Sequence, residues 1–107
     1  MAKTITIKGS FTVKSVNQTA TVEVFTIDSN GFKNDYPGYP IKFTDDFNLI
    51  LDQCTPNQNY YVDFVGYTFG GTFTFNIIGD IANPTPPISD TFNNIRFIPA
   101  YCLLTNS

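Results

Sequence analysis

The chain has 107 residues, of which 42% are hydrophobic, 16% aromatic and only 14% charged. This composition excludes intrinsic disorder, and the length is typical of one domain, which we expect to span residues 1–107. A net charge of −3 with a single arginine also argues against a nucleic-acid partner, because such a partner requires a cluster of basic groups.

Apolar and polar residues alternate through the first half of the chain, which is typical of half-buried strands. Strands are predicted at residues 4–8, at 11–15 after Gly9, with Phe11 and Val13 pointing inward, and at 20–27. The turn sequence DSNG follows, and residues 31–40, with two prolines and two glycines, are predicted to form an ordered loop. From Ile41 to Leu51 five apolar residues fall on odd positions, so this segment is predicted to be one strand with one polar face: Ile41, Phe43, Phe47, Leu49 and Leu51.

The densest aromatic stretch, YYVDFVGYTFGGTFTF at residues 60–75, poses a problem of two faces. Gly70-Gly71 predicts a two-residue hairpin turn, since glycine adopts positive φ at little cost. One face of this hairpin is apolar and is predicted to belong to the core: Tyr60, Val62, Phe64, Phe73, Phe75 and Ile77. The other face is mixed: Tyr61, Asp63, Val65, Tyr67 and Phe69 on one strand, with Thr72, Thr74, Asn76 and Ile78 on the other.

Two interpretations of the mixed face remain open from the sequence. The loop at residues 28–40 could fold over it and bury its rings, since monomers rarely expose large apolar patches. Alternatively, the rings form a contact surface for a protein subunit or a sugar, because aromatic side chains bury much area at small entropic cost. On the second interpretation, the predicted binding residues are Tyr61, Val65, Tyr67, Phe69, Thr72 and Thr74.

The second half of the chain continues in strands, and no helical periodicity is present. Residues 79–90 form a proline-rich return, and residues 91–105 predict one or two strands interrupted by Pro99. About seven short strands with frequent turns predict an all-β fold. We expect a single β-sandwich of immunoglobulin-like or Greek-key type, with a small barrel as the alternative.

Two cysteines leave two alternatives. A bridge between Cys54 and Cys102 would close a loop of roughly 50 residues, stabilise the fold by about 4 kcal/mol and indicate an oxidising compartment. Two free, buried thiols are the other alternative, because cysteine is among the most buried residue types.

Catalysis has little chemical basis here, because the chain has no histidine, the commonest general base and zinc ligand. We predict that the protein is not an enzyme, has no cofactor and has no metal site. Calcium near Asp28, Asn30 and Asp35 is a weaker alternative to a plain turn, since the terminal glutamate of a calcium loop is missing.

The sequence therefore predicts a non-catalytic structural or assembly module that acts through protein contacts, as a subunit of a virion, fibre, secretion-type particle or surface structure. The alternative is a lectin-like module that binds carbohydrate on the aromatic face of the 60–78 hairpin. Partners are expected to be protein, either self or other subunits, or glycan, without nucleic acid and without membrane insertion. The chain shows no signal peptide, so its location is left open, with a virion or extracellular setting favoured by composition.

Overall fold

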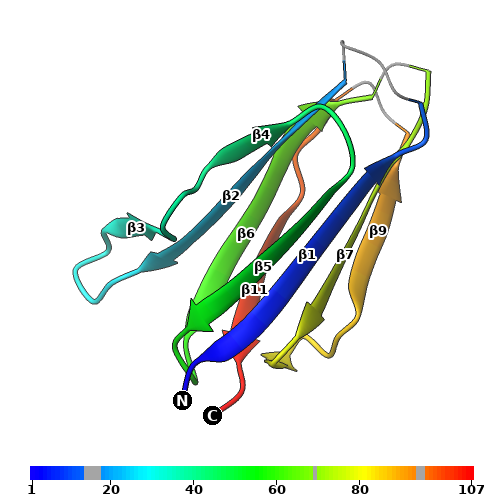
Figure 1. Cartoon of the computed structure of the whole chain (residues 1–107). Helices are drawn as coiled ribbons and strands as arrows, with labels where there is room; N and C mark the ends of the chain where they lie inside the picture. The colour runs from blue at the N-terminus through cyan, green and yellow to red at the C-terminus, as the bar shows by residue number, and fades with distance from the viewer. Residues whose placement is uncertain (14–17, 69, 94–95) are drawn as a thin grey trace.

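The computed structural model describes residues 1–13, 18–68, 70–93 and 96–107, and every regular element in these ranges is a β-strand. The strands form two antiparallel sheets that lie one over the other (Figure 1). Sheet A has the order β5-β1-β7-β9 and consists of β1 (Lys3–Phe11), β5 (Phe47–Cys54), β7 (Phe73–Gly79) and β9 (Ile88–Phe92). Sheet B has the order β3-β2-β6-β11-β8 and consists of β2 (Thr19–Ile27), β3 (Lys33–Asp35), β6 (Asn59–Tyr67), β8 (Ile81–Asn83) and β11 (Ala100–Thr105). In addition, β4 (Ile41–Phe43) pairs with β2, and β10 (Arg96–Phe97) pairs with β6.

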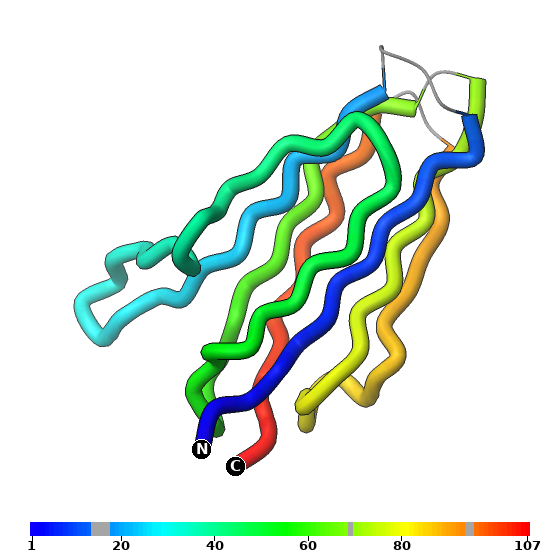
Figure 2. Tube along the Cα trace, in the orientation of Figure 1, coloured from blue at the N-terminus to red at the C-terminus, as the bar shows by residue number. Residues whose placement is uncertain are grey.

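The all-β prediction is confirmed, because every regular element described is a strand. The two sheets are not closed into a barrel, so the barrel alternative is excluded. The chain crosses repeatedly from one sheet to the other, as the trace in Figure 2 shows. Strand β4 lies in sheet B and β5 in sheet A, β6 returns to sheet B, β7 to sheet A, β8 to sheet B and β9 to sheet A. Neighbours in sequence are therefore seldom neighbours in a sheet.

The core lies between the sheets and is dominated by phenylalanine. The rings of Phe64 in sheet B and Phe75 in sheet A lie 4.7 Å apart, and those of Phe73 in sheet A and Phe97 in sheet B lie 4.9 Å apart and nearly parallel. All six residues predicted for the core face are buried. That prediction is confirmed, because strand alternation alone decides which side chains point inward.

Several predicted boundaries are wrong, each for a local reason. The expected strand from Ile41 to Leu51 is two strands in different sheets, separated by a bend at residues 44–46. The expected break at Gly9 is absent, because β1 runs through it and the Phe47 ring packs where a Cβ at Gly9 would lie. Val13, predicted to point inward, is exposed, since β1 ends at Phe11. The expected loop at 31–40 contains β3.

One buried polar side chain joins the C-terminal strand to the turn between β5 and β6. The hydroxyl of Thr105 donates a hydrogen bond to the Thr55 carbonyl over 2.6 Å and accepts one from the Gln58 amide over 2.9 Å. Thr105 is 1% exposed. Its hydroxyl therefore supplies partners to two backbone groups that sheet pairing leaves over.

Candidate interaction surfaces

The predicted hairpin at residues 60–78 does not form. Strand β6 pairs with β2 and β11, whereas β7 pairs with β1 and β9 in the opposite sheet. After Gly71, the backbone amide of Thr72 donates a hydrogen bond to the Thr12 hydroxyl, and the Thr72 carbonyl accepts one from the backbone amide of Thr12. These bonds place the start of β7 beside the end of β1. Two strands that each have one apolar face can lie side by side in one sheet or face to face in two sheets. Here β6 and β7 lie in opposite sheets, and their apolar faces are buried against each other.

The predicted binding residues are therefore separated. Tyr61, Val65 and Tyr67 lie on the outer face of sheet B, whereas Thr72 and Thr74 lie on the side of sheet A. Phe69 lies outside the described residues. The combination of rings and hydroxyl groups predicted for one surface is thus divided between opposite sides of the molecule.

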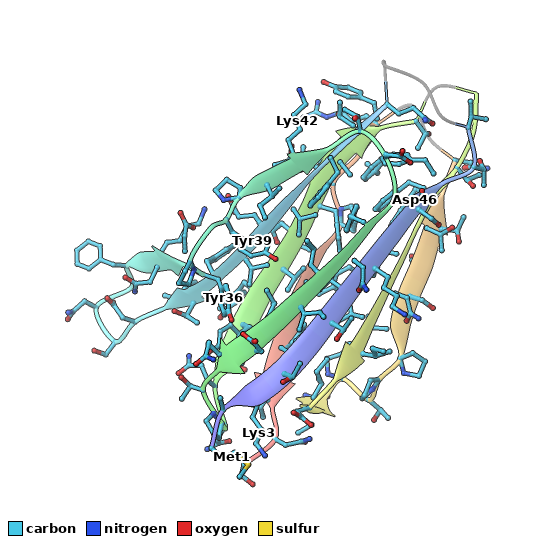
Figure 3. The ribbon with its side chains drawn as sticks, in the orientation of Figure 1. Met1, Lys3, Tyr36, Tyr39, Lys42 and Asp46 are labelled. Carbon is cyan, nitrogen blue, oxygen red and sulfur yellow. The ribbon has the colours of Figure 1, made fainter. Side chains whose placement is uncertain are left out.

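The loop at residues 28–40 does not cover the rings of sheet B, so this alternative is wrong. Its tyrosines, Tyr36 and Tyr39, pack at the margin of the core beside β5 (Figure 3). The Tyr36 ring lies edge-on to Tyr60, and its hydroxyl accepts a hydrogen bond from the Gln53 amide in β5. Phe32 at the loop tip is 67% exposed. The loop packs along one side of the gap between the sheets and leaves Val65 and Tyr67 on the outer face of sheet B exposed.

The outer face of sheet B carries an acidic and aromatic end near β3. The Phe25 and Tyr61 rings are stacked with centroids 5.3 Å apart, and the Lys33 ammonium lies 4.6 Å from the Phe25 centroid. The same ammonium forms an ion pair with Glu23 over 2.9 Å. This hydrogen bond to Glu23 raises the pKa of Lys33. Lys33 is thus held over a ring by a carboxylate.

Asp63 lies directly opposite Glu23 on the neighbouring strand. Partial burial raises the pKa of the Asp63 carboxyl, and the facing Glu23 carboxylate raises it further, while Lys33 acts in the opposite direction. Within the described part of the chain, Asp63 has no ion pair and no hydrogen-bond partner for its side chain. Two like charges face each other here, and only Glu23 has its own counter-ion.

The other end of this face is apolar with basic groups beside it. Val65 and Tyr67 are each 45% exposed, and Ile98 is 63% exposed. Arg96 in β10 lies opposite Tyr67, and Lys42 in β4 lies in the same row as Val65 but two strands away, with Thr21 of β2 between them. Figure 3 places Lys42 at the end of sheet B away from β3. Neither basic side chain forms an ion pair with any described residue.

The cysteines are not bridged, so the disulfide alternative is wrong. Cys54 is buried in the core, whereas Cys102 is exposed on the outer face of sheet B beside Tyr61. The Cys102 thiol is the main cause of a raised Tyr61 pKa. Burial raises the pKa of the Cys54 thiol to about 11. The alternative of free thiols holds, although only one of the two is buried.

The DSNG segment is a hairpin turn between β2 and β3. One Asp28 carboxylate oxygen accepts hydrogen bonds from the Asn30 and Phe32 amides, and the other accepts a longer one from the Asn34 side chain. These bonds, that to Phe32 first, lower the pKa of Asp28. The carboxylate is thus occupied by its own turn. In the described ranges, no group of three or more acidic, cysteine or histidine side chains could hold a metal ion.

The outer face of sheet A is mostly polar, apart from Ile50 and Ile78 in one row, and contains a shallow trough of about 440 Å³. Lys8 lies between Asn48 and Asn76 in one row across three strands, and Ser10 and Thr74 form the next row. Of the predicted residues, only Thr74 lines this trough. Its lining offers hydroxyl and amide groups without an outward-facing ring.

The sheet edges are blunted against strand addition. Strands β3, β4 and β8 have three residues each, and Pro84 follows β8. In β5 the outward Gln53 amide is occupied by the Tyr36 hydroxyl. In β9, Asp90 lies opposite buried Phe75, so a charge sits on the inward side of the edge. Short strands, prolines and inward charges are known devices against edge-to-edge association.

Comparisons with known proteins give no relative: no family model, no curated protein and no solved structure matches the chain. No helix in the described residues is long and apolar enough to cross a membrane.

Proposed function

We propose that this chain is a non-catalytic structural or assembly module that binds another protein chain through the outer face of sheet B. The observation that carries the proposal is the exposure of Val65 and Tyr67, each 45%, on β6, a strand in the interior of sheet B. Exposed rings and branched side chains on an inner strand of a sheet, with polar groups around them, are typical of protein interfaces.

The edges of the sheets support a contact through a face. Strand addition needs a long open edge, whereas the described edges are short, carry an inward charge or have an occupied amide group. At the end that carries Val65 and Tyr67, the face of sheet B is also less polar than the trough on sheet A, which is lined by Lys8, Asn76 and Thr74.

In wider terms, we propose a β-sandwich of the Greek-key type that serves as a subunit of a virion, fibre, secretion-type particle or surface structure. Two stacked open sheets joined by repeated crossings support the fold, and low charge with many rings supports the assembly role. The absence of histidine supports a role without catalysis.

The test is the native mass by light scattering over a concentration series. We expect association in the wild type and its loss when Val65 and Tyr67 are both replaced by serine. The matched control replaces Ile50 and Ile78, which are exposed on the outer face of sheet A, by serine as well. This control should associate as the wild type does. Equal mass distributions for the wild type and the Val65→Ser, Tyr67→Ser variant would refute the proposal.

A second candidate function, glycan binding, is favoured by the trough on sheet A. Asn48, Asn76, Ser10 and Thr74 offer donors and acceptors suited to sugar hydroxyls, and Lys8 adds a positive charge. The trough lacks the aromatic rings that the predicted hairpin would have placed on the same face as Thr74. A glycan screen with Asn76→Ala as the control tests it: a hit that the control variant loses would support this function, and no hit would remove it.

A further inference from the structure

The charges on the outer face of sheet B are separated along the strands. Glu23, Asp63 and Asp35 lie toward one end with Lys33, Arg96 lies toward the other, and Lys42 lies on β4 in the row of Val65 between them. Asp63 at one end and Arg96 at the other have no ionic partner among the described residues. A partly buried carboxylate with a raised pKa and an unpaired guanidinium on one face are complementary to each other, although they lie on the same chain.

The spacing prevents them from meeting within one copy. Asp63 and Tyr67 are four residues apart on β6, roughly 13 Å along an extended strand, and Arg96 lies opposite Tyr67 on the next strand. Along β6, Val65 lies midway between Asp63 and Tyr67. Consider a two-fold axis that passes through Val65, lies in the plane of the face and runs across the strands. It reverses the strand direction in the second copy, so the Asp63 end of each copy lies over the Arg96 end of the other.

We infer that the partner is a second copy of this chain, bound face to face about such an axis. This inference rests on the proposed function and names its partner. Val65 packs against Val65 of the second copy, and each Arg96 reaches Asp63 of the other copy, which yields two equivalent ion pairs. Lys42 lies in the row of Val65, so the two copies of this exposed side chain face each other at the rim of the contact, where solvent screens them.

The size of the face sets the expected strength of the contact. Four strand widths, namely β4 with β3, then β2, then β6, then β10 with β11, spaced about 4.8 Å apart over about seven residues, give roughly 450 Å² per copy, or about 900 Å² in total. This lies at the lower end of specific interfaces, so we expect a weak, concentration-dependent dimer. Because the ion pairs lie near solvent, raising the salt from about 0.05 to about 0.5 M should weaken it.

Charge exchange tests the pairing by sedimentation equilibrium up to about 500 μM, a range chosen for a weak interface. Arg96→Asp and Asp63→Arg should each weaken dimerisation at least about tenfold, because each places like charges opposite each other. The variant with both changes should recover the wild-type dissociation constant to within about threefold, since the pairs are restored with reversed sign. Lys8→Asp on sheet A alters the net charge as Arg96→Asp does and should have no effect.

Circular dichroism and thermal melts establish that each variant folds, and Asp63→Asn replaces Asp63→Arg if the latter does not. A strict monomer, or single variants without effect, would overturn the inference. If Val65→Ser with Tyr67→Ser reduces association but the double exchange does not recover it, the face is correct and this two-fold pairing is wrong. If the Val65 and Tyr67 variant also has no effect, the proposed function fails with it.

Discussion

Replacing Thr105 by valine should destabilise the protein although the shape of the side chain hardly changes. The hydroxyl of this buried residue donates to Thr55 and accepts from Gln58. Valine keeps the volume but leaves that carbonyl and that amide without their partner. With about 1–1.5 kcal/mol for each lost bond to a partly buried group, the free energy of unfolding should fall by about 2–3 kcal/mol.

Urea denaturation, followed by fluorescence or circular dichroism, measures this loss. The midpoint should fall by roughly 1–2 M at an unchanged slope, and the melting temperature by roughly 10 °C. Thr105→Ser is the matched control, because it keeps the hydroxyl and loses one methyl group, at a cost of about 1 kcal/mol. If the valine variant were as stable as the serine variant or more stable, the two hydrogen bonds would contribute nothing net, and the reasoning would be refuted.

Three further predictions concern the thiols and one glycine. In the native protein one thiol, Cys102, should react quickly with a disulfide reagent, and two should react in denaturant, because Cys54 is buried; a native count of zero or two would contradict the structure. Because burial raises the Cys54 pKa to about 11, the stability that this group provides is present below about pH 9 and is lost as the pH rises to about 11. Stability curves against pH should therefore fall less in Cys54→Ala than in the wild type, and parallel curves would exclude this linkage. Gly66→Ala should cost at least about 2 kcal/mol, because its Cβ would collide with backbone and with the Phe97 ring. Gly38→Ala, at positive φ but with open space around it, should cost about 1 kcal/mol, and the reverse order would show that packing at Gly66 yields.

The sequence predicted which side chains point inward far better than which strands are neighbours. Alternation sets the direction of a side chain whatever the strand pairs with, so Phe64, Phe73 and Phe75 were assigned to the core correctly. The pairing of β6 with β7 was wrong, because Gly70-Gly71 serves a crossing between sheets as well as it serves a tight turn.

The candidate site was affected by the same error. Tyr61, Val65 and Tyr67 share one strand, so their common face was predictable, whereas Thr72 and Thr74 depended on the hairpin. Arg96 was missed as part of this surface. It comes beside Tyr67 only through the pairing of β10 with β6, a long-range contact with no local signal in the sequence.

The repeated crossing between sheets also bears on how the chain folds. Sheet A needs strands from residues 3 to 92, and sheet B needs strands from residues 19 to 105, so neither sheet can be completed by a contiguous piece of the chain. Most pairings must wait for the closure of long loops, which places folding on a time scale of milliseconds to seconds. During synthesis, β2 and β6 are complete and can pair before β11, the other neighbour of β6 in sheet B, has been made. Until then, one side of β6 is an open edge of nine residues, and protection by a chaperone would matter most at that stage.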